Sequence, residues 1–182
     1  MIGKGKSISH TRASMSYGWN QEKDAEIVLK EFLHGDSPAE ITQEFKMLQD
    51  QNYHCNKNTL SFVISPTIED GKRLGKNELQ AITKRFMHEM KLGERQAIAF
   101  VHQDKDHKHI HLYVNRIDFK GVAYNDSFIG KRSQLAAEKV AESMGLTTVK
   151  QVQFEKEFNL KEIRSEMKRR HDLTMKQFQP KS

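Results

Sequence analysis

Hydrophobic positions along the chain repeat with two different periods, which separate expected strands from expected helices. Apolar and polar residues alternate in 109–115, the period of a half-buried strand. In 76–91 the apolar residues recur every three or four positions, as on an amphipathic helix. Further strands are expected at 25–33, 58–65, 96–101 and 122–124, and further helices at 13–19, 37–51, 132–144 and 155–175.

Taken in order, these elements predict an α+β fold. Short strands separated by helices favour a central antiparallel sheet with helices mainly on one face. Residues 1–150 are expected to form this domain, and residues 151–182 a charged C-terminal helix beyond it. Segment 3–12 shows no periodicity and is assigned to no element, and 66–75 is expected to be a loop.

The polar face of the 109–115 strand carries chemistry. His109 and His111 are two residues apart, so their imidazoles project from the same side of a strand. His102 ends the preceding strand, and the six residues between it and His109 suit a hairpin loop. The loop would return His102 beside His109. Three histidines on two paired strands predict a site for one divalent cation with positions left open for a ligand.

A His-x-His pattern by itself more often marks solvated or core histidines than a metal site. Here four of the nine histidines fall within ten residues, which favours the metal interpretation. His107 is expected in the hairpin loop, in solvent and outside the set of ligands.

The same stretch resembles a motif of a known family. It reads His102-x-Asp104-x-Asp106-x-x-His109-Ile110-His111, followed by Asn115. This string resembles the third motif of the HUH-type relaxases, and most closely that of the mobilisation relaxases. These enzymes nick the DNA of plasmids and integrative elements for conjugation. The resemblance implies the HUH relaxase fold and a single-strand endonuclease that also transfers the strand.

The resemblance also implies a nucleophile near the N-terminus. Relaxases place a tyrosine ahead of the first long helix, and Tyr17 fits that position. The residues alone favour a plainer interpretation, in which Tyr17 is a half-buried aromatic. Some mobilisation relaxases use an N-terminal histidine instead, so His10 stays open as a second candidate.

Further site residues follow partly from this resemblance and partly from the basic and aromatic residues along the chain. The three histidines would hold Mg²⁺ or Mn²⁺, which neutralises charge on the scissile phosphate. Asp104 is the candidate to accept the phenolic proton, with Asp106 and Asp118 as alternatives. Contacts to DNA are expected from Ser65, Asn115, Lys72, Arg73, Lys76, Lys131 and Arg132, base stacking from Trp19, Tyr113 and Tyr124, and further phosphate contacts from the basic cluster 168–171.

Composition and charge agree with this interpretation. The 182 residues are enough for one domain with a core, and 36% are apolar and 30% charged. The formal charge of +6 favours a polyanionic partner. No run of 18 apolar residues and no secretory signal is present, and the single Cys55 suits a reducing compartment. A cytoplasmic monomer is expected, acting on single-stranded DNA at an origin of transfer with accessory mobilisation proteins and a coupling protein.

Other classes of protein remain as alternatives. Rolling-circle replication initiators and transposases of the same superfamily often carry His-x-His ahead of the tyrosine, whereas here Tyr17 comes first. A non-catalytic DNA-binding protein with a structural metal would ordinarily use several cysteines, and this chain has one. A dioxygenase would need two histidines and a carboxylate.

Overall fold

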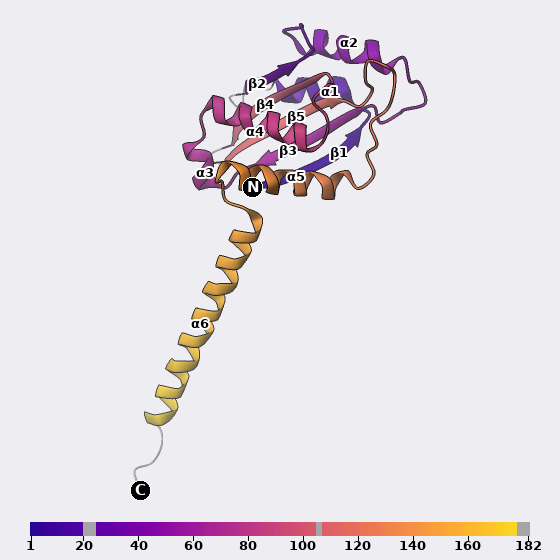
Figure 1. Ribbon diagram of the computed structural model, residues 1–182. Helices are drawn as coiled ribbons and strands as arrows, with labels where there is room; N and C mark the ends of the chain where they lie inside the picture. Colours follow the sequence, from indigo (N-terminus) through magenta and orange to yellow (C-terminus); the bar gives the residue numbers. More distant parts are fainter. Residues whose placement is uncertain (20–24, 105–106, 178–182) are drawn as a thin grey trace. The chain divides into compact units, whose positions relative to one another are not determined.

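A five-stranded antiparallel sheet forms the centre of the N-terminal part of the chain (Figure 1). The computed structural model describes residues 1–19, 25–104 and 107–177. The strands are β1 (Ile2–Ile8), β2 (Glu26–Glu31), β3 (Thr59–Ser65), β4 (Ala97–Asp104) and β5 (His107–Asn115), in the order β1-β3-β5-β4-β2. The predicted α+β class is confirmed. The histidine-bearing strand β5 is central, with β3 on one side and β4 on the other.

The larger core lies between one face of the sheet and two helices, α4 (Lys76–Glu89) and α5 (Ile129–Met144). Its fully buried members include Leu60, Phe62, Ile64, Ile110, Leu112 and Val114 from the sheet, with Ile82, Phe86 and Ala137 from the helices. Burial of each large side chain stabilises the fold by about 1.5–3 kcal/mol. This core therefore fixes which face of β5 is apolar.

A smaller core covers one end of the opposite face, beneath α1 (Thr11–Gly18) and α2 (Pro38–Gln49). It consists of Met15, Leu33, Ile41, Phe45, Ile98, Phe100 and Tyr113. Helix α2 begins where Ser37 accepts a hydrogen bond from the Glu40 N–H and Pro38 occupies the first turn. Because this core holds α1 against the face that carries the histidines, it positions the functional site.

Strand β1 was not predicted, because glycine and lysine alternate in its sequence and no large apolar residues mark a buried face. Gly3 and Gly5 face α5, and a Cβ on Gly3 would lie 2.5 Å from the Ser133 carbonyl oxygen and 2.6 Å from the Ala137 Cβ. Only a residue without a side chain allows that approach. Lys4 and Lys6 alternate with the glycines and are exposed on the other face.

The expected loop 66–75 contains a short helix, α3 (Ile68–Arg73). Thr67 caps it by accepting a hydrogen bond from the Asp70 N–H. The buried Asp70 carboxylate accepts hydrogen bonds from the Thr147 N–H and from Arg73. Burial opposes ionisation of Asp70, but these hydrogen bonds outweigh it and hold its pKa below the ordinary value. The carboxylate thus joins α3 to the end of the domain.

Two further predictions about strands need correction. His107 lies in β5, paired with Asp104, and not in a solvated loop, so the hairpin connection is shorter than expected. The strand expected at 122–124 is reduced to one isolated bridge between Ile117 and Ala123. Here the backbone turns at Gly121, whose φ of 77° is in the left-handed region.

Residues 148–182 form a separate unit, which contains helix α6 (Val149–Gln177). Over residues 149–175, where burial is described, almost all side chains are exposed and the apolar ones form no buried face. Arg170 pairs with Glu166 one turn earlier, 3.1 Å apart. Within the described residues, no helix is long and apolar enough to cross a membrane.

The close approach of β1 to α5 predicts that Gly3→Ala lowers the free energy of unfolding by about 1–3 kcal/mol, because the new methyl meets backbone atoms that cannot move away. Urea denaturation measures this change. Lys4→Ala, one residue along and facing the other way, is the matched control and should change stability by under about 0.5 kcal/mol. Equal effects of the two substitutions would contradict the packing described for β1.

Candidate active site

The register of the β4–β5 hairpin brings the three predicted histidines to one face of the sheet. His102 is paired directly with His109, and Phe100 with His111. Paired residues in an antiparallel ladder project from the same face, with Cβ atoms about 4.5–5.5 Å apart. The ring centroids of His102 and His111 are 4.4 Å apart. The hairpin therefore returns His102 beside His109, as the sequence predicts.

His102 is held by the backbone of α1. Its ring is fully buried, and its Nε2–H donates a hydrogen bond to the Gly18 carbonyl oxygen, 3.0 Å away. A carbonyl oxygen only accepts, so the hydrogen belongs to Nε2, and in the neutral ring Nδ1 keeps a lone pair. Within the described part of the chain, this Nδ1 atom is buried without a hydrogen-bond partner. A buried, oriented lone pair of this kind is suited to bind a metal ion.

Tyr17 lies next to His102 and His111. Its ring centroid is 5.3 Å from that of His102 and 5.4 Å from that of His111. Helix α1 comes this close because Met15 is buried beneath it and because Gly18 has no side chain. A Cβ on Gly18 would lie 2.5 Å from the Phe100 ring. The Tyr17 side chain is 43% exposed, so a substrate can reach it.

The third histidine makes a different contact. His109 Nδ1 and the Ser65 hydroxyl are hydrogen-bonded at 2.8 Å, across the β3–β5 pairing. Ser65, which was expected to touch DNA, therefore contacts the histidine cluster (His102, His109 and His111). His107 stacks on His109 with ring centroids 5.9 Å apart. It lies on the same face but at the exposed end of β5.

The donor set can be compared with what a metal ion needs. Among residues 1–19, 25–104 and 107–177, no three His, Cys, Asp or Glu side chains converge as a metal-binding group. The histidine cluster nevertheless offers imidazoles on a single face, and His102 supplies the buried lone pair described above. Imidazole nitrogens are suitable ligands for a divalent ion. In this structure Nδ1 of His109 is hydrogen-bonded to Ser65.

The candidate carboxylates are less well placed or lie outside the described residues. The backbone of Asp104 ends β4, but its side chain and all of Asp106 lie outside the described part. Asp118 closes its own turn by accepting hydrogen bonds from the Lys120 and Val122 N–H groups. It also pairs with Arg95 at 3.6 Å. These contacts give Asp118 a role in the turn and away from the histidines.

Asn115, which was expected to contact DNA, is enclosed by other parts of the domain in this structure. Its side chain is fully buried and donates hydrogen bonds to the Phe45 carbonyl and to Gln96, while its oxygen accepts from the Ile117 N–H. All of its polar atoms are therefore used to join β5 to α2 and to the following turn. An asparagine at the end of a strand can form structural hydrogen bonds of this kind as readily as it can bind a ligand.

The expected stacking residues are also largely enclosed. Tyr113 is 4% exposed, and its burial, together with the neighbouring Tyr17, raises its pKa to about 12. Tyr124 is buried and donates a hydrogen bond to the Met90 carbonyl. Trp19 is half-buried and packs edge-on against Phe100, 4.8 Å between centroids. None of the three offers a free ring to a base in this structure.

The expected basic contacts fall into two places that the fold does not bring together. Lys72 and Arg73 end α3, which lies beside Lys108 of β5. Lys131 and Arg132 begin α5, beside β1. Arg132 donates to the Asn125 carbonyl and lies over the Tyr124 ring, 5.0 Å from its centroid. The α3 pair lies near the histidine end of β5. Lys76, the remaining lysine of this set, is paired with Glu26 at 2.7 Å, and Glu26 is opposite Val101, next to His102.

Two lysines on the open face were not singled out from the sequence. Lys4 pairs with Val63 of β3, and Val63 pairs with His111, so all three lie in one row across the sheet. At about 4.8 Å per strand, Lys4 is roughly 10 Å from His111. Lys6 begins the next row. No carboxylate of the described residues pairs with either lysine. Lys4 and Lys6 could have been identified from the sequence only if segment 2–8 had been recognised as a strand.

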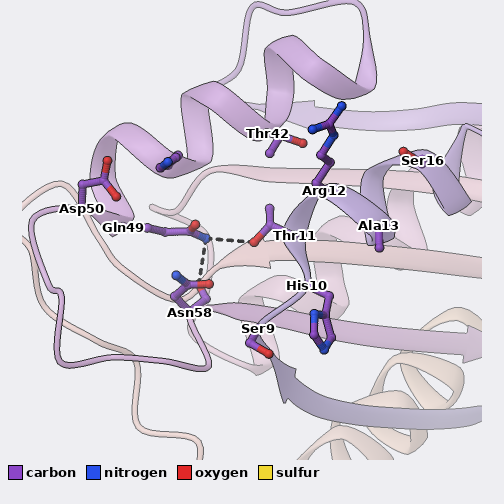
Figure 2. Close-up of a pocket in the computed structure, with 11 residues that line it drawn as sticks. Ser9, His10, Thr11, Arg12, Ala13, Ser16, Thr42, Gln49, Asp50 and Asn58 are labelled. Carbon is purple, nitrogen blue, oxygen red and sulfur yellow. Dashed lines mark hydrogen bonds between the residues drawn. The ribbon is translucent and has the colours of Figure 1, made fainter.

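His10 lies in a different place from Tyr17. It sits at the N-terminal end of α1 and lines a cavity of about 630 Å³ with Arg12, Lys46 and other residues of α1 and α2. Figure 2 shows Gln49 at this cavity, hydrogen-bonded to Thr11 and Asn58. Tyr17 is seven positions after His10 along α1, which corresponds to about 10 Å along the helix axis. No member of the histidine cluster lines the cavity of His10.

Comparison with known proteins identifies the class. The family described as "Relaxase: MobA/VirD2-like, nuclease domain" matches residues 17–146, which is more than half of the chain. The chain therefore belongs to this relaxase family, and the family resemblance inferred from the histidine motif is confirmed. A comparison with curated protein sequences finds no match.

A solved structure supports the fold. The chain is similar to the MobM relaxase domain (MOBV; Mob_Pre), which was determined bound to a 26-nucleotide oriT DNA of pMV158. The TM-score is 0.55 at 12% sequence identity, over 81% of this chain and 88% of the other. At this identity the likeness establishes a shared relaxase fold.

The bond between His102 and Gly18 predicts that His102→Ala is destabilising. Loss of a fully buried ring and of a buried hydrogen bond should lower the free energy of unfolding by about 2–4 kcal/mol. His107→Ala, at the exposed end of β5, should cost under about 0.5 kcal/mol. Chemical denaturation followed by circular dichroism measures both, and a His102→Ala protein as stable as the wild type would contradict the anchoring of α1.

Proposed function

We propose that this protein is a relaxase that nicks single-stranded DNA at an origin of transfer, with Tyr17 as the nucleophile. The observation that carries the proposal is the position of the Tyr17 ring, 5.3 Å and 5.4 Å from the rings of His102 and His111. A tyrosine, exposed to solvent on one side and bordered by imidazoles on the other, can receive a phosphate on the open face of the sheet. Membership of the relaxase nuclease family supports the same reaction.

The reaction exchanges one phosphate ester for another. The Tyr17 phenolate oxygen bonds to the scissile phosphorus, and the bond from phosphorus to the 3′ oxygen breaks. The products are a free 3′ hydroxyl and a 5′-phosphotyrosyl strand. Because a phenolate is a tolerable leaving group, the step is reversible, as strand rejoining requires. The phenolic proton would pass to a nearby carboxylate or water, and Asp104 at the end of β4 is our candidate acceptor. The same group or a water would return one proton to the departing 3′ oxygen, which becomes the 3′ hydroxyl.

A divalent ion would be held by His102, His109 and His111, with Mg²⁺ or Mn²⁺ expected. When bound, such an ion polarises a non-bridging phosphate oxygen. The protein's own contribution is orientation: the Gly18 carbonyl fixes the ring of His102, and Ser65 contacts Nδ1 of His109. Partners on the second ring nitrogen are the usual means by which proteins orient metal-binding histidines.

The DNA strand would approach along the open face of the sheet. Lys4 and Lys6 of β1 lie on the face that carries the histidines and would neutralise phosphates there. Lys72 and Arg73 end α3, which lies at the same end of the sheet but beside Lys108, and would contact the strand past that end. Lys131 and Arg132 at the start of α5 lie beside β1 and would contact further phosphates. Accessory mobilisation proteins and a coupling protein are the further partners expected of a cytoplasmic relaxase, acting here as a monomer.

Tyr17→Phe should abolish the covalent protein–DNA adduct while leaving the fold intact. The substitution removes only the phenolic oxygen, so the free energy of unfolding should change by under about 1 kcal/mol. Incubation with single-stranded DNA carrying the origin sequence and Mn²⁺, followed by denaturing electrophoresis, measures the adduct. His10→Ala is the paired control and should still form it. Adduct formation by Tyr17→Phe but not by His10→Ala would assign the nucleophile to His10.

The double substitution Lys4→Gln and Lys6→Gln should weaken binding of single-stranded DNA and reduce its dependence on salt. Each lost phosphate contact should flatten the slope of log K against log salt by about 0.7. Fluorescence anisotropy over a series of salt concentrations gives the slope. Lys139→Gln, on α5 and paired with Glu89, is the control that should leave the slope unchanged. An unchanged slope in the double variant would remove β1 from the DNA path.

A further inference from the structure

Two phenylalanines lie side by side on the surface, at the end of the sheet remote from the histidine cluster. Phe32 follows β2 and is 50% exposed, and Phe119, in the turn after β5, is 53% exposed. Their ring centroids are 5.6 Å apart at an interplanar angle of 75°. Together with Lys84, Lys91 and Lys120 they line a groove of about 770 Å³. We call this groove the Phe32–Phe119 surface.

The backbone at Phe32 is strained in a way that keeps its ring outside. Its φ is 54°, in the left-handed region that bulky residues rarely adopt. The turn lets Leu33 enter the core beneath α1 and α2 while Phe32 points to solvent. Glycine or asparagine would adopt this conformation at lower cost. Strain of this kind concentrates at binding sites, where the displayed side chain has a use.

The charge around the two rings is predominantly positive. Arg95 and His88 also line the groove, against two carboxylates, Glu94 and Asp118. Asp118 is already engaged with Arg95 and with the backbone of its own turn. Lys84 lies 3.8 Å from Glu31, whereas no described carboxylate is within ion-pair distance of the Lys91 or Lys120 ammonium group. The charge of Lys120 does help to lower the pKa of Asp118. Two exposed cations therefore flank two exposed aromatic rings.

We propose that the Phe32–Phe119 surface is a second binding site for single-stranded DNA, in which the rings stack on bases and Lys91 and Lys120 contact phosphates. Each nucleotide carries a planar face and one negative charge, which this combination complements without regard to sequence. The choice of DNA over another anion rests on the proposed function, which brings a single strand to this domain. An acidic peptide is the competing occupant.

The surface would bind a different part of the strand from the part that is cut. Residue Ala97 of β4 pairs with Glu31, next to Phe32, and His102 is five residues further along the same strand. At about 3.3 Å per residue, roughly 17 Å separate the two sites. The nucleotides bound here would therefore lie several nucleotides away from the scissile phosphate. Their contact with the protein does not involve the bond that is cut.

The test uses photo-crosslinking in the Tyr17→Phe protein, so that strand transfer plays no part. An oligonucleotide of about 12 nucleotides carrying 5-iodouracil should crosslink to peptides that contain Phe32 or Phe119. The double variant Phe32→Asn and Phe119→Ala should lose these crosslinks and bind a strand of about 30 nucleotides roughly five- to tenfold more weakly. Asparagine tolerates the left-handed conformation, so the fold should survive. Tyr53→Ala, which removes another exposed aromatic, is the control and should leave affinity unchanged.

The outcomes separate this proposal from the proposed function. Crosslinks at Phe32 or Phe119 without covalent adduct formation by the wild-type protein would support the second site and contradict the nicking reaction. An adduct with no such crosslinks and unchanged affinity in the double variant would overturn the second site alone. Binding of polyglutamate that depends on both phenylalanines, without binding of the oligonucleotide, would also overturn it in favour of an acidic partner.

Discussion

The direct pairing of His102 with His109 is the constraint on which the rest of the site depends. A shift of one residue in this register would turn His109 and His111 toward the apolar core and bring Ile110 and Leu112 to the open face. The large core prevents such a shift, because Ile110, Leu112 and Val114 are fully buried against α4 and α5. Burial of the apolar face of β5 therefore also keeps the imidazoles on the opposite face.

Helix α1, which carries Tyr17, is joined to the histidine-bearing strands by close contacts. Helix α1 is fixed through the hydrogen bond from His102 to the Gly18 carbonyl and through the contact of Gly18 with Phe100. His102 thus has two tasks: it orients the helix that carries Tyr17, and it presents a buried lone pair. A substitution at His102 should affect the stability of α1 as well as any metal affinity, so the two effects have to be measured separately.

Much of this arrangement could be predicted because it follows from local periodicity. The alternation in 109–115 identified β5, and the spacing of apolar residues identified α4 and α5. β1 could not be found in that way, because Gly3 and Gly5 face α5 at a distance that only the tertiary structure reveals. The burial of Asn115 could not be predicted for a similar reason, since its partners Phe45 and Gln96 are distant in the chain. Sequence patterns show which face is apolar, but not which polar residue is enclosed by another element.

Peptide mapping of the covalent adduct tests the central claim most directly. Trypsin cuts after Lys6, Arg12 and Lys23, so residues 7–12 with His10 and residues 13–23 with Tyr17 fall in separate peptides. After reaction of the wild-type protein with single-stranded origin DNA, nuclease digestion and mass spectrometry, we expect the nucleotide mass on peptide 13–23, at Tyr17. A nucleotide on peptide 7–12, or on any peptide outside 13–23, would contradict the account.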